Sequence, residues 1–347
     1  MTAHHSAEQQ RPAAVSSVRR LFDWWSARRR FEFCLTVSMV MVLSGICVAL
    51  LMLPNWVLPN MRATPPAPID SVGQVAATDP RLTEVRRIVE PFGPVIARRV
   101  PTGDGQQSLV IGHSPQQTDI DILQRELAAA TAAVTDVWGT DWAQSTLVVV
   151  ASSPAEFAAL VRAAALLPTE VAAASVADPF PPGTRPSGQR VVFSSDAGHR
   201  LDPAGLATLL RHELTHIAAR AQTADGAPLW MVEGFADYIA HHDQGHRFAD
   251  IAPTVTAHGR VHDLPPELPT DTEFSGPNAA FTYEKAWSIC AFVAEKYDSS
   301  RLVQLYHRIA AAKQNPATED RILRDVLGTT RTDFLTDWHS WLIARTA

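Results

Sequence analysis

An uncharged run of 21 residues at 33–53, FCLTVSMVMVLSGICVALLML, constrains the topology of this chain more than any other feature of its sequence. As a helix the run would be about 31 Å long at roughly 1.5 Å per residue, which matches the hydrocarbon thickness of a bilayer. We therefore expect residues 33–53 to form a transmembrane helix that separates a short N-terminal part from a long C-terminal part.

The charges around this run predict its orientation. Residues 1–32 contain six arginines and three acidic residues, and three of the arginines, at 28–30, stand just before the run, whereas only Arg62 follows soon after it. By the positive-inside rule, residues 1–32 form a basic tail in the cytoplasm and the remaining chain lies outside it. The sequence thus predicts a single-pass protein of the cell membrane with an extracytoplasmic domain.

Two export signals are the alternatives to a permanent anchor. A cleaved signal peptide has a shorter apolar core, of about 7 to 15 residues, and a small-residue cleavage site, whereas PNWVLPNMRA follows the run here. The VRRLF at 18–22 resembles a twin-arginine signal only faintly. The sequence favours the anchor and leaves open whether the segment is cleaved.

The rest of the chain divides into a linker and one domain. Residues 54–80 are rich in proline and small side chains, which predicts a linker, and residues 81–347 suffice for one folded domain. The net charge of −6 comes without a long run of like charge in this domain, so nothing indicates a nucleic-acid partner. Cys290 is the only cysteine after residue 53, which excludes an intrachain disulfide and a cysteine metal cluster from the domain.

Hydrophobic patterns predict an α+β domain in which strands come first and helices dominate later. Strands are expected at 108–112, 145–151 and 189–195, with a long helix at 119–138. Asp202 followed by Pro203 is a typical helix start. Further helices are expected from Pro228 to about His241, from 277 or 278 to Tyr297, and three times after that.

The helix after Asp202 carries the segment RHELTHIAAR at 211–220. Residues four apart share one face of a helix, so His212 and His216 can bind one ion from the same side. Glu213 is offset by about 100 degrees, so it can reach a water molecule on the ion more easily than the ion itself. Nitrogen ligands with an open coordination position favour Zn2+. A surface helix with two solvated histidines is the alternative.

A second signal stands in PLWMVEGFADYIA at 228–240, where Glu233 interrupts an apolar helix start. A carboxylate among these apolar side chains is costly to bury without a partner, and zinc is a suitable partner. Asp237 shares a helical face with Glu233, and carboxylates commonly accept the second ring N–H of a ligating histidine. The sequence thus predicts Asp237 in that supporting role and three zinc ligands, His212, His216 and Glu233. A solvated helix residue near Tyr238 is the alternative for Asp237.

H-E-x-x-H followed at this distance by W-x-x-E-G-x-A-D resembles the gluzincin branch of zinc metallopeptidases, and more closely the peptidase MA-like proteins, which are often membrane-anchored. The resemblance covers roughly residues 108–347 and is most specific at 211–240. It implies a zincin-like domain with a small N-terminal sheet and a mainly helical C-terminal half. It also implies an edge strand, at 191–194, which would bind an extended peptide by strand addition.

The resemblance further implies a residue that stabilises the transition state. The segment FTYEKAWSICAFVAEKY at 281–297 is similar to the Y-x-x-A helix of such proteins, and Tyr283 fits this role because a phenol near the zinc can hydrogen-bond an oxyanion. An ordinary half-buried tyrosine is the alternative for Tyr283, and His262 or His258 would then take the stabilising role. The other histidines are expected to be solvated, namely His4, His5, His241, His242 and His246.

Two related groups of zinc peptidases do not match this sequence. Ala219 and Gln222 stand where the metzincin pattern has glycine and histidine. The G-x-M-E-N motif by which gluzincin aminopeptidases hold a substrate amine is absent from the sequence, so exopeptidase action has no support.

These features together predict a membrane-anchored zinc peptidase, an endopeptidase acting on a peptide or protein substrate. Glu213 is its expected general base, acting on a metal-activated water molecule. Two other functions are compatible with the same residues: a catalytically silent zincin-fold binding or assembly domain, and a zinc hydrolase of non-peptide amides in the cell envelope.

Overall fold

The computed structural model describes residue 79 and residues 81–103, 105–165, 167, 171–181, 184–260, 263–264 and 266–346. The basic tail (1–32), the expected transmembrane helix (33–53), His262 and all of the linker except Asp79 lie outside the described residues. Within the described ranges, no helix has the length and apolar character needed to cross a bilayer. The membrane span at 33–53 therefore stays a prediction.

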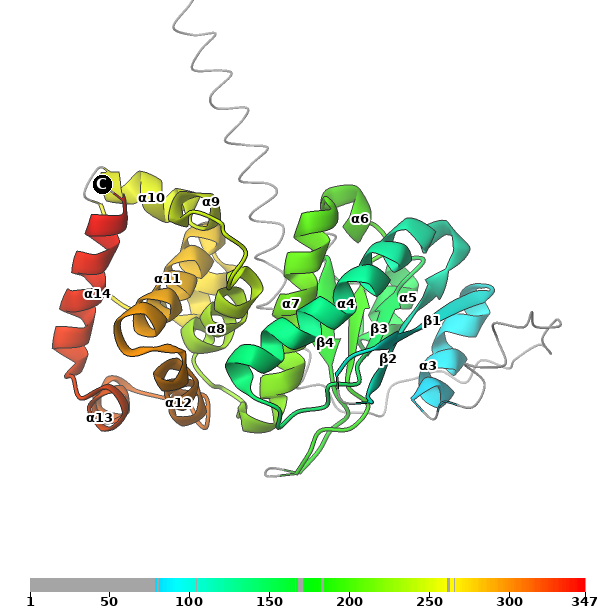
Figure 1. Cartoon of the computed structure of the whole chain (residues 1–347), viewed down its shortest axis with the longest axis horizontal. Coiled ribbons are helices and arrows are strands. Elements are labelled where there is room, and N and C mark those ends of the chain that lie inside the picture. Colours follow the sequence, from blue (N-terminus) through cyan, green and yellow to red (C-terminus); the bar gives the residue numbers. More distant parts are fainter. Residues whose placement is uncertain are drawn as a thin grey trace, which may run out of the picture.

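A five-stranded mixed sheet forms the N-terminal half of the domain (Figure 1). Its spatial order is β1-β2-β3-β5-β4; β2, β3 and β5 are parallel, while β1 and β4 pair antiparallel at the two edges. The strands are β1 (Val95–Pro101), β2 (Gln107–His113), β3 (Leu147–Val150), β4 (Ala173–Val176) and β5 (Arg190–Phe193). The central strands β3 and β5 are buried at every position, as expected for strands that are covered on both faces.

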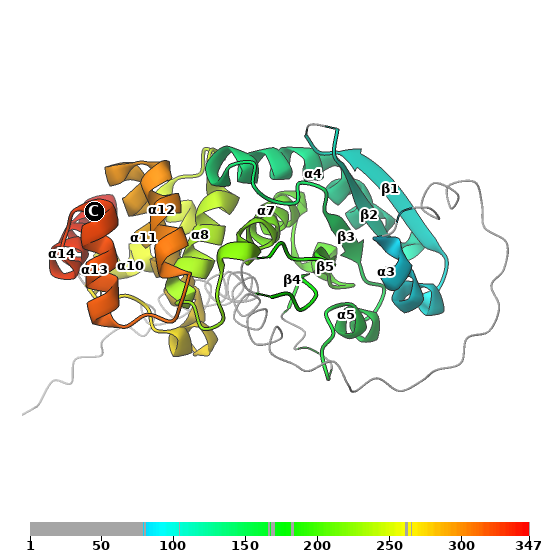
Figure 2. The ribbon, with the colours of Figure 1, turned by 90° about the horizontal axis from the view of Figure 1, so that it is seen from below.

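Helices cover both faces of this sheet (Figure 2). The long helices α4 (Gln117–Trp138) and α7 (Pro203–Ala219) pack against each other and against one face. The short helices α3 (Leu82–Val89) and α5 (Pro154–Leu160) lie on the other side. Three further short segments complete this half, η1 (Glu90–Phe92), η2 (Ser114–Gln116) and α6 (Ala197–Arg200).

The C-terminal half is helical and lies beside the sheet half (Figure 1). Its central helix, α11 (Ala279–Tyr297), packs against α8 (Leu229–His241) and against two of the helices that follow it. The remaining elements are η3 (Arg220–Gln222), α9 (Phe248–Ile251), α10 (Pro253–Arg260), η4 (Asp271–Ser275), α12 (Ser299–Ile309), α13 (Pro316–Leu327) and α14 (Arg331–Thr346). One continuous apolar core runs through both halves.

The expected α+β architecture, with a small sheet first and a mainly helical second half, is confirmed. The expected edge strand at 191–194 is wrong, because β5 pairs with β3 on one side and with β4 on the other. The edge beside α7 is β4, which the sequence analysis missed together with β1, α9 and α10. β4 consists of AASV, four small residues without a clear alternation, and β1 is interrupted by Arg98 and Arg99, so neither gives a local strand pattern.

The helices α8 and α11 approach each other closely at Gly234. A Cβ atom at this position would lie 2.4 Å from the carbonyl oxygen of Ala286, a separation that real Cβ atoms do not adopt. Glycine is therefore required where the two helices touch. Because Gly234 follows Glu233 directly, this contact fixes the position of α8 relative to α11 next to Glu233.

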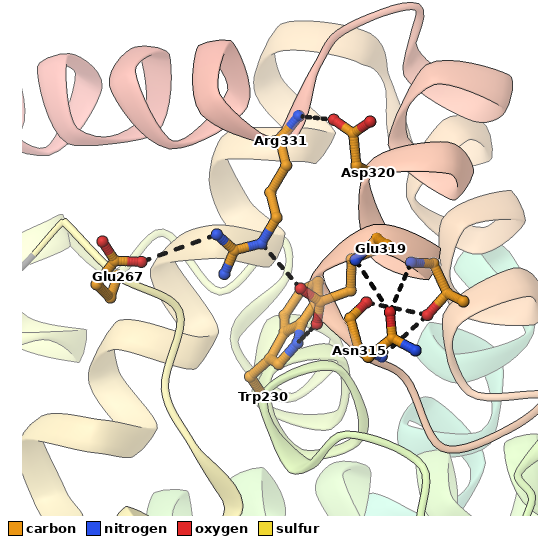
Figure 3. Close-up of polar contacts among 8 residues, drawn as sticks. Trp230, Glu267, Asn315, Glu319, Asp320 and Arg331 are labelled. Atoms are coloured by element: carbon orange, nitrogen blue, oxygen red, sulfur yellow. Dashed lines mark hydrogen bonds and ion pairs between the residues drawn. The ribbon is translucent and has the colours of Figure 1, made fainter.

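A polar network joins the start of α8 to the last helices (Figure 3). Glu319 of α13 is 9% exposed; its carboxylate accepts a bond from Trp230 Nε1 at 3.4 Å and one from Arg331 Nε at 3.0 Å. The backbone N–H of Arg331 donates to Asp320 at 2.7 Å. The network thus holds the first turn of α8, three residues before Glu233, against α13 and α14.

Candidate metal centre

Two helices, α7 and α8, supply the residues that the sequence predicted for a metal site. Asp202 caps α7, since its Oδ1 accepts a hydrogen bond from the backbone N–H of Gly205 at 2.7 Å, and Pro203 occupies the first helical turn. Because α7 packs between α4 and α8 and also contacts β4, the middle of the helix is buried on nearly every side.

The side chains of His212, His216 and Glu233 converge on one point. The two Nε2 atoms lie 3.0 Å apart, and Glu233 Oε2 lies 3.5 Å from His212 Nε2 and 3.6 Å from His216 Nε2. Two ligand atoms on one tetrahedral zinc, with bonds of about 2.0–2.1 Å, are separated by about 3.3 Å. The three donor atoms are therefore spaced as three ligands of a single ion would be.

Burial and charge also indicate that this cluster is a metal site. Glu233 is fully buried, and neither of its oxygens accepts a hydrogen bond of ordinary length from the described residues. Burial raises the pKa of Glu233, but the imidazoles of His216 and His212 outweigh it and hold that pKa at about 2. A buried carboxylate that faces two imidazole nitrogens is a donor set suited to zinc.

Asp237 lies behind the cluster and orients one of its histidines. Asp237 Oδ1 is 2.8 Å from Nδ1 of His212. Burial lowers the pKa of His212, yet the carboxylates of Asp237 and Glu233 outweigh this and raise it well above its ordinary value. When Nδ1 donates its proton to Asp237, the lone pair of Nε2 points into the cluster, which is the tautomer a metal requires.

Glu213 is fully buried, and neither of its oxygens accepts a hydrogen bond of ordinary length from the described residues, although the side chain of Ser175 on β4 is close enough to lower its pKa. Burial raises the pKa of Glu213, and the neighbouring imidazoles of His212 and His216 offset part of this increase. Among the described residues, no hydrogen bond of ordinary length therefore ties this carboxylate to the fold, in contrast to Asp237.

The other predicted site residues have different surroundings. Tyr283 lies on α11, is 1% exposed, and packs its ring edge-on against Phe274 with centroids 4.9 Å apart, so its catalytic role stays a prediction. His258 lies on α10, where its Nδ1 is 3.2 Å from the carbonyl oxygen of Asp263, and it does not join the cluster.

His241 is not solvated as expected. It is partly covered at the end of α8, its Nδ1 lies 3.5 Å from Nδ1 of His246, and burial lowers its pKa to about 4. The chain turns back after α8 through Asp243 and Gly245, both with positive φ, and this turn brings His246 over His241. The prediction that His241 is solvated failed because the contact between His241 and His246 depends on this turn.

The other histidines that were expected to be solvated differ in exposure. His242 is partly covered and His246 is exposed, while His4 and His5 lie outside the described residues.

A pocket that the sequence analysis missed adjoins the cluster. It has a volume of about 50 Å³, and its walls include His216 and Glu233 together with residues of β4, the end of α7 and the segment before α8. One of its lining residues is Arg220. No local sequence pattern predicts this pocket, because β4 has no alternating strand pattern and Arg220 is typical of the arginines found at the ends of helices.

No protein-family model matches this chain, and no curated protein matches it. Among solved structures, it is similar to an M1 zinc metallopeptidase from Deinococcus radiodurans, with 15% identity and a TM-score of 0.45 over 74% of this chain and 53% of that chain. A mutant of that enzyme matches with 16% identity and a TM-score of 0.44 over 74% of this chain and 53% of that chain. A two-domain M1 zinc metallopeptidase mutant bound to L-arginine matches with 16% identity and a TM-score of 0.44 over 72% of this chain and 52% of that chain.

The chain thus spans about half the length of these matched structures.

Proposed function

We propose that this protein is a zinc-dependent endopeptidase with a zincin-like domain, anchored to the cell membrane through residues 33–53 and facing away from the cytoplasm. The observation that carries the proposal is the convergence of His212, His216 and Glu233, whose donor atoms all lie within 4.8 Å of one another in a buried part of the domain. His–His–carboxylate is the donor set of a catalytic zinc site that keeps one position open.

His212, His216 and Glu233 would hold the zinc ion, and Asp237 would keep His212 in the ligating tautomer. A zinc ion held there would supply Lewis-acid chemistry, polarising a carbonyl group and lowering the pKa of water towards neutrality.

The general base in this proposal is Glu213. It takes a proton from water as the water oxygen forms a bond to the carbonyl carbon, and it delivers that proton to the amide nitrogen as the C–N bond breaks. The products are a carboxylic acid and an amine, so one water molecule is consumed for each bond cleaved. Tyr283 is the proposed donor of a hydrogen bond to the carbonyl oxygen as negative charge develops on it.

Substrate binding in this proposal uses β4, the edge strand next to α7. An edge strand presents backbone N–H and C=O groups to which an extended peptide can add. Ser175 of β4 and Ala177, which follows the strand, line the same pocket as His216 and Glu233. A peptide added to β4 would therefore pass directly beside the cluster.

The test uses the full-length protein and two variants. Wild type should bind one zinc ion per chain and cleave members of a random peptide library, and cleavage should stop when a chelator removes the metal. Glu213→Gln should keep the zinc and lose cleavage, because an amide cannot act as the base. His216→Ala should lose the zinc.

Two outcomes would contradict the proposal. Undiminished turnover by zinc-loaded Glu213→Gln would refute the assigned base. Wild type that holds stoichiometric zinc but cleaves no peptide would instead favour a silent binding domain or a hydrolase of non-peptide amides.

A further inference from the structure

The pocket beside the cluster is lined by apolar side chains, by one arginine, Arg220, and by polar residues that include Asp225. Val176, Ile217 and Val232 provide hydrophobic surface next to His216 and Glu233. Arg220 lies one helical turn after His216, which corresponds to about 6 Å along the helix axis. A side chain that entered this pocket from a peptide on β4 would therefore lie beside both apolar surface and the guanidinium group of Arg220.

The guanidinium of Arg220 is held in place by the protein. Its Nη1 donates to the carbonyl oxygen of Thr223 at 2.7 Å, and its Cζ lies over the ring of Phe180, 4.8 Å from the ring centroid. Its side chain is 20% exposed. A fixed and partly desolvated guanidinium is suited to recognising a carboxylate.

The charge of Arg220 is only loosely balanced by the protein. Its ion-pair partner is Asp225, at 3.8 Å from Nη2, and the side chain of Asp225 is 62% exposed. An ion pair of this length at the surface is weak, because water molecules stabilise the exposed carboxylate about as well as the arginine does. Its buried Nε has no hydrogen-bond partner among the described residues. Burial lowers the pKa of Arg220, and an additional anion would offset that cost.

We propose that this pocket binds a glutamate side chain of the peptide substrate, with its two methylene groups against the apolar walls and its carboxylate on Arg220. The inference rests on the proposed peptidase function and adds a substrate class to it, namely peptides with an acidic residue close to the cleaved bond.

The experiment compares fluorogenic peptides that differ at a single residue. Glutamate, glutamine or leucine is placed in turn at each of three positions on either side of the cleaved bond, and kcat/KM is measured with full-length protein. At one position kcat/KM for the glutamate peptide should be about tenfold or more higher than kcat/KM for the glutamine peptide, because a hydrogen bond to a charged group contributes a free energy of that size. This ratio of the two kcat/KM values is the readout for the variants. The ratio should fall towards one in Arg220→Gln and decrease with added salt.

Two further variants sharpen the test. Asp225→Asn removes the competing carboxylate and should increase the ratio. Arg308→Gln makes the same charge change at an arginine that is 53% exposed on α12 and pairs with Asp325, and it should leave the ratio at the wild-type value. A ratio near one in wild type at every position, or an unchanged ratio in Arg220→Gln, would overturn the inference.

Failure of the proposed function would look different. If wild type cleaves none of the peptides, binding of the same glutamate and glutamine peptides to zinc-loaded Glu213→Gln is measured by fluorescence anisotropy. Tighter binding of the glutamate peptide that disappears in Arg220→Gln would uphold the pocket assignment. Equal binding would refute it.

Discussion

Nδ1 of His212 lies 2.8 Å from Oδ1 of Asp237, and Asp237 stands one turn of α8 after Glu233. One helix therefore supplies both a carboxylate of the cluster and the carboxylate that orients a histidine of the cluster. A shift of α8 relative to α7 would disturb both contacts together, so the packing of α8 bears directly on metal binding.

Replacing Asp237 with Asn should weaken zinc binding by about 10- to 100-fold, because His212 loses the anionic acceptor that fixes its tautomer. The measurement is competition with a chelator of known affinity. Asp243→Asn is the matched control, since Asp243 follows the same helix and its side chain is 87% exposed. Equal zinc affinity in Asp237→Asn and wild type would show that the hydrogen bond does not support the site.

The Gly234→Ala substitution tests the contact between α8 and α11. The added Cβ would lie 2.4 Å from the carbonyl oxygen of Ala286, so the helices must move apart. Overpacking of this kind costs about 1–3 kcal/mol of unfolding free energy, and the displaced helix should also bind zinc less tightly. Gly276→Ala is the control, because its nearest neighbour would be 3.4 Å away. Denaturant unfolding of the metal-free proteins and chelator competition measure the two effects separately.

Much of the candidate site follows from helix geometry within single segments. His212 and His216 share a face of α7, and Glu233 and Asp237 share a face of α8, because each pair is four residues apart. Such spacing is visible in the sequence whatever the tertiary structure.

The parts that could not be predicted depend on contacts between distant segments. The edge strand β4 is defined by its pairing with β5 and not by its own four residues. The position of Arg220 in a pocket follows from that strand, and the burial of His241 follows from the turn that folds His246 back. Local patterns carry no information about these contacts.

Tyr283→Phe tests the proposed hydrogen bond to the developing oxyanion. We expect kcat to fall by about 100-fold or more, with KM and zinc content close to wild type, because only the transition state uses the hydroxyl. Tyr297→Phe, at the other end of α11, serves as the control. An unchanged kcat in Tyr283→Phe would assign this residue to the core and reopen the question of the stabilising group.

The network at Glu319 predicts unequal effects for two arginines near α13. Arg331→Gln should lower the unfolding free energy by about 1–3 kcal/mol, because it leaves a nearly buried carboxylate without its charged partner. Arg324→Gln should have a much smaller effect, since that arginine is 56% exposed and its partner, Asp320, keeps the hydrogen bond from the backbone N–H of Arg331. Denaturant midpoints at constant pH compare the two, and equal losses would contradict the role of the network.

Glu284 predicts a specific pH dependence of stability. It lies buried on α11, where Oε2 accepts a hydrogen bond from the backbone N–H of Val255 at 2.7 Å. Burial raises its pKa from 4.5 to about 7. Between these two values the folded protein holds a proton on Glu284 that the unfolded chain has lost, so unfolding releases a proton and stability falls as the pH rises.

The variant Glu284→Gln isolates this contribution, since an amide of the same shape cannot titrate. The unfolding free energy of the variant minus that of wild type should rise by about 3 kcal/mol between about pH 4.5 and pH 7, at roughly 1.4 kcal/mol per pH unit. Any cost of burying the amide N–H groups is independent of pH and cancels from this slope. Glu295→Gln, the same substitution at a position 49% exposed on the same helix, is the control. Urea unfolding of both variants across this range decides the matter, and a flat difference for Glu284→Gln would mean that the buried carboxyl titrates as it does in the unfolded chain.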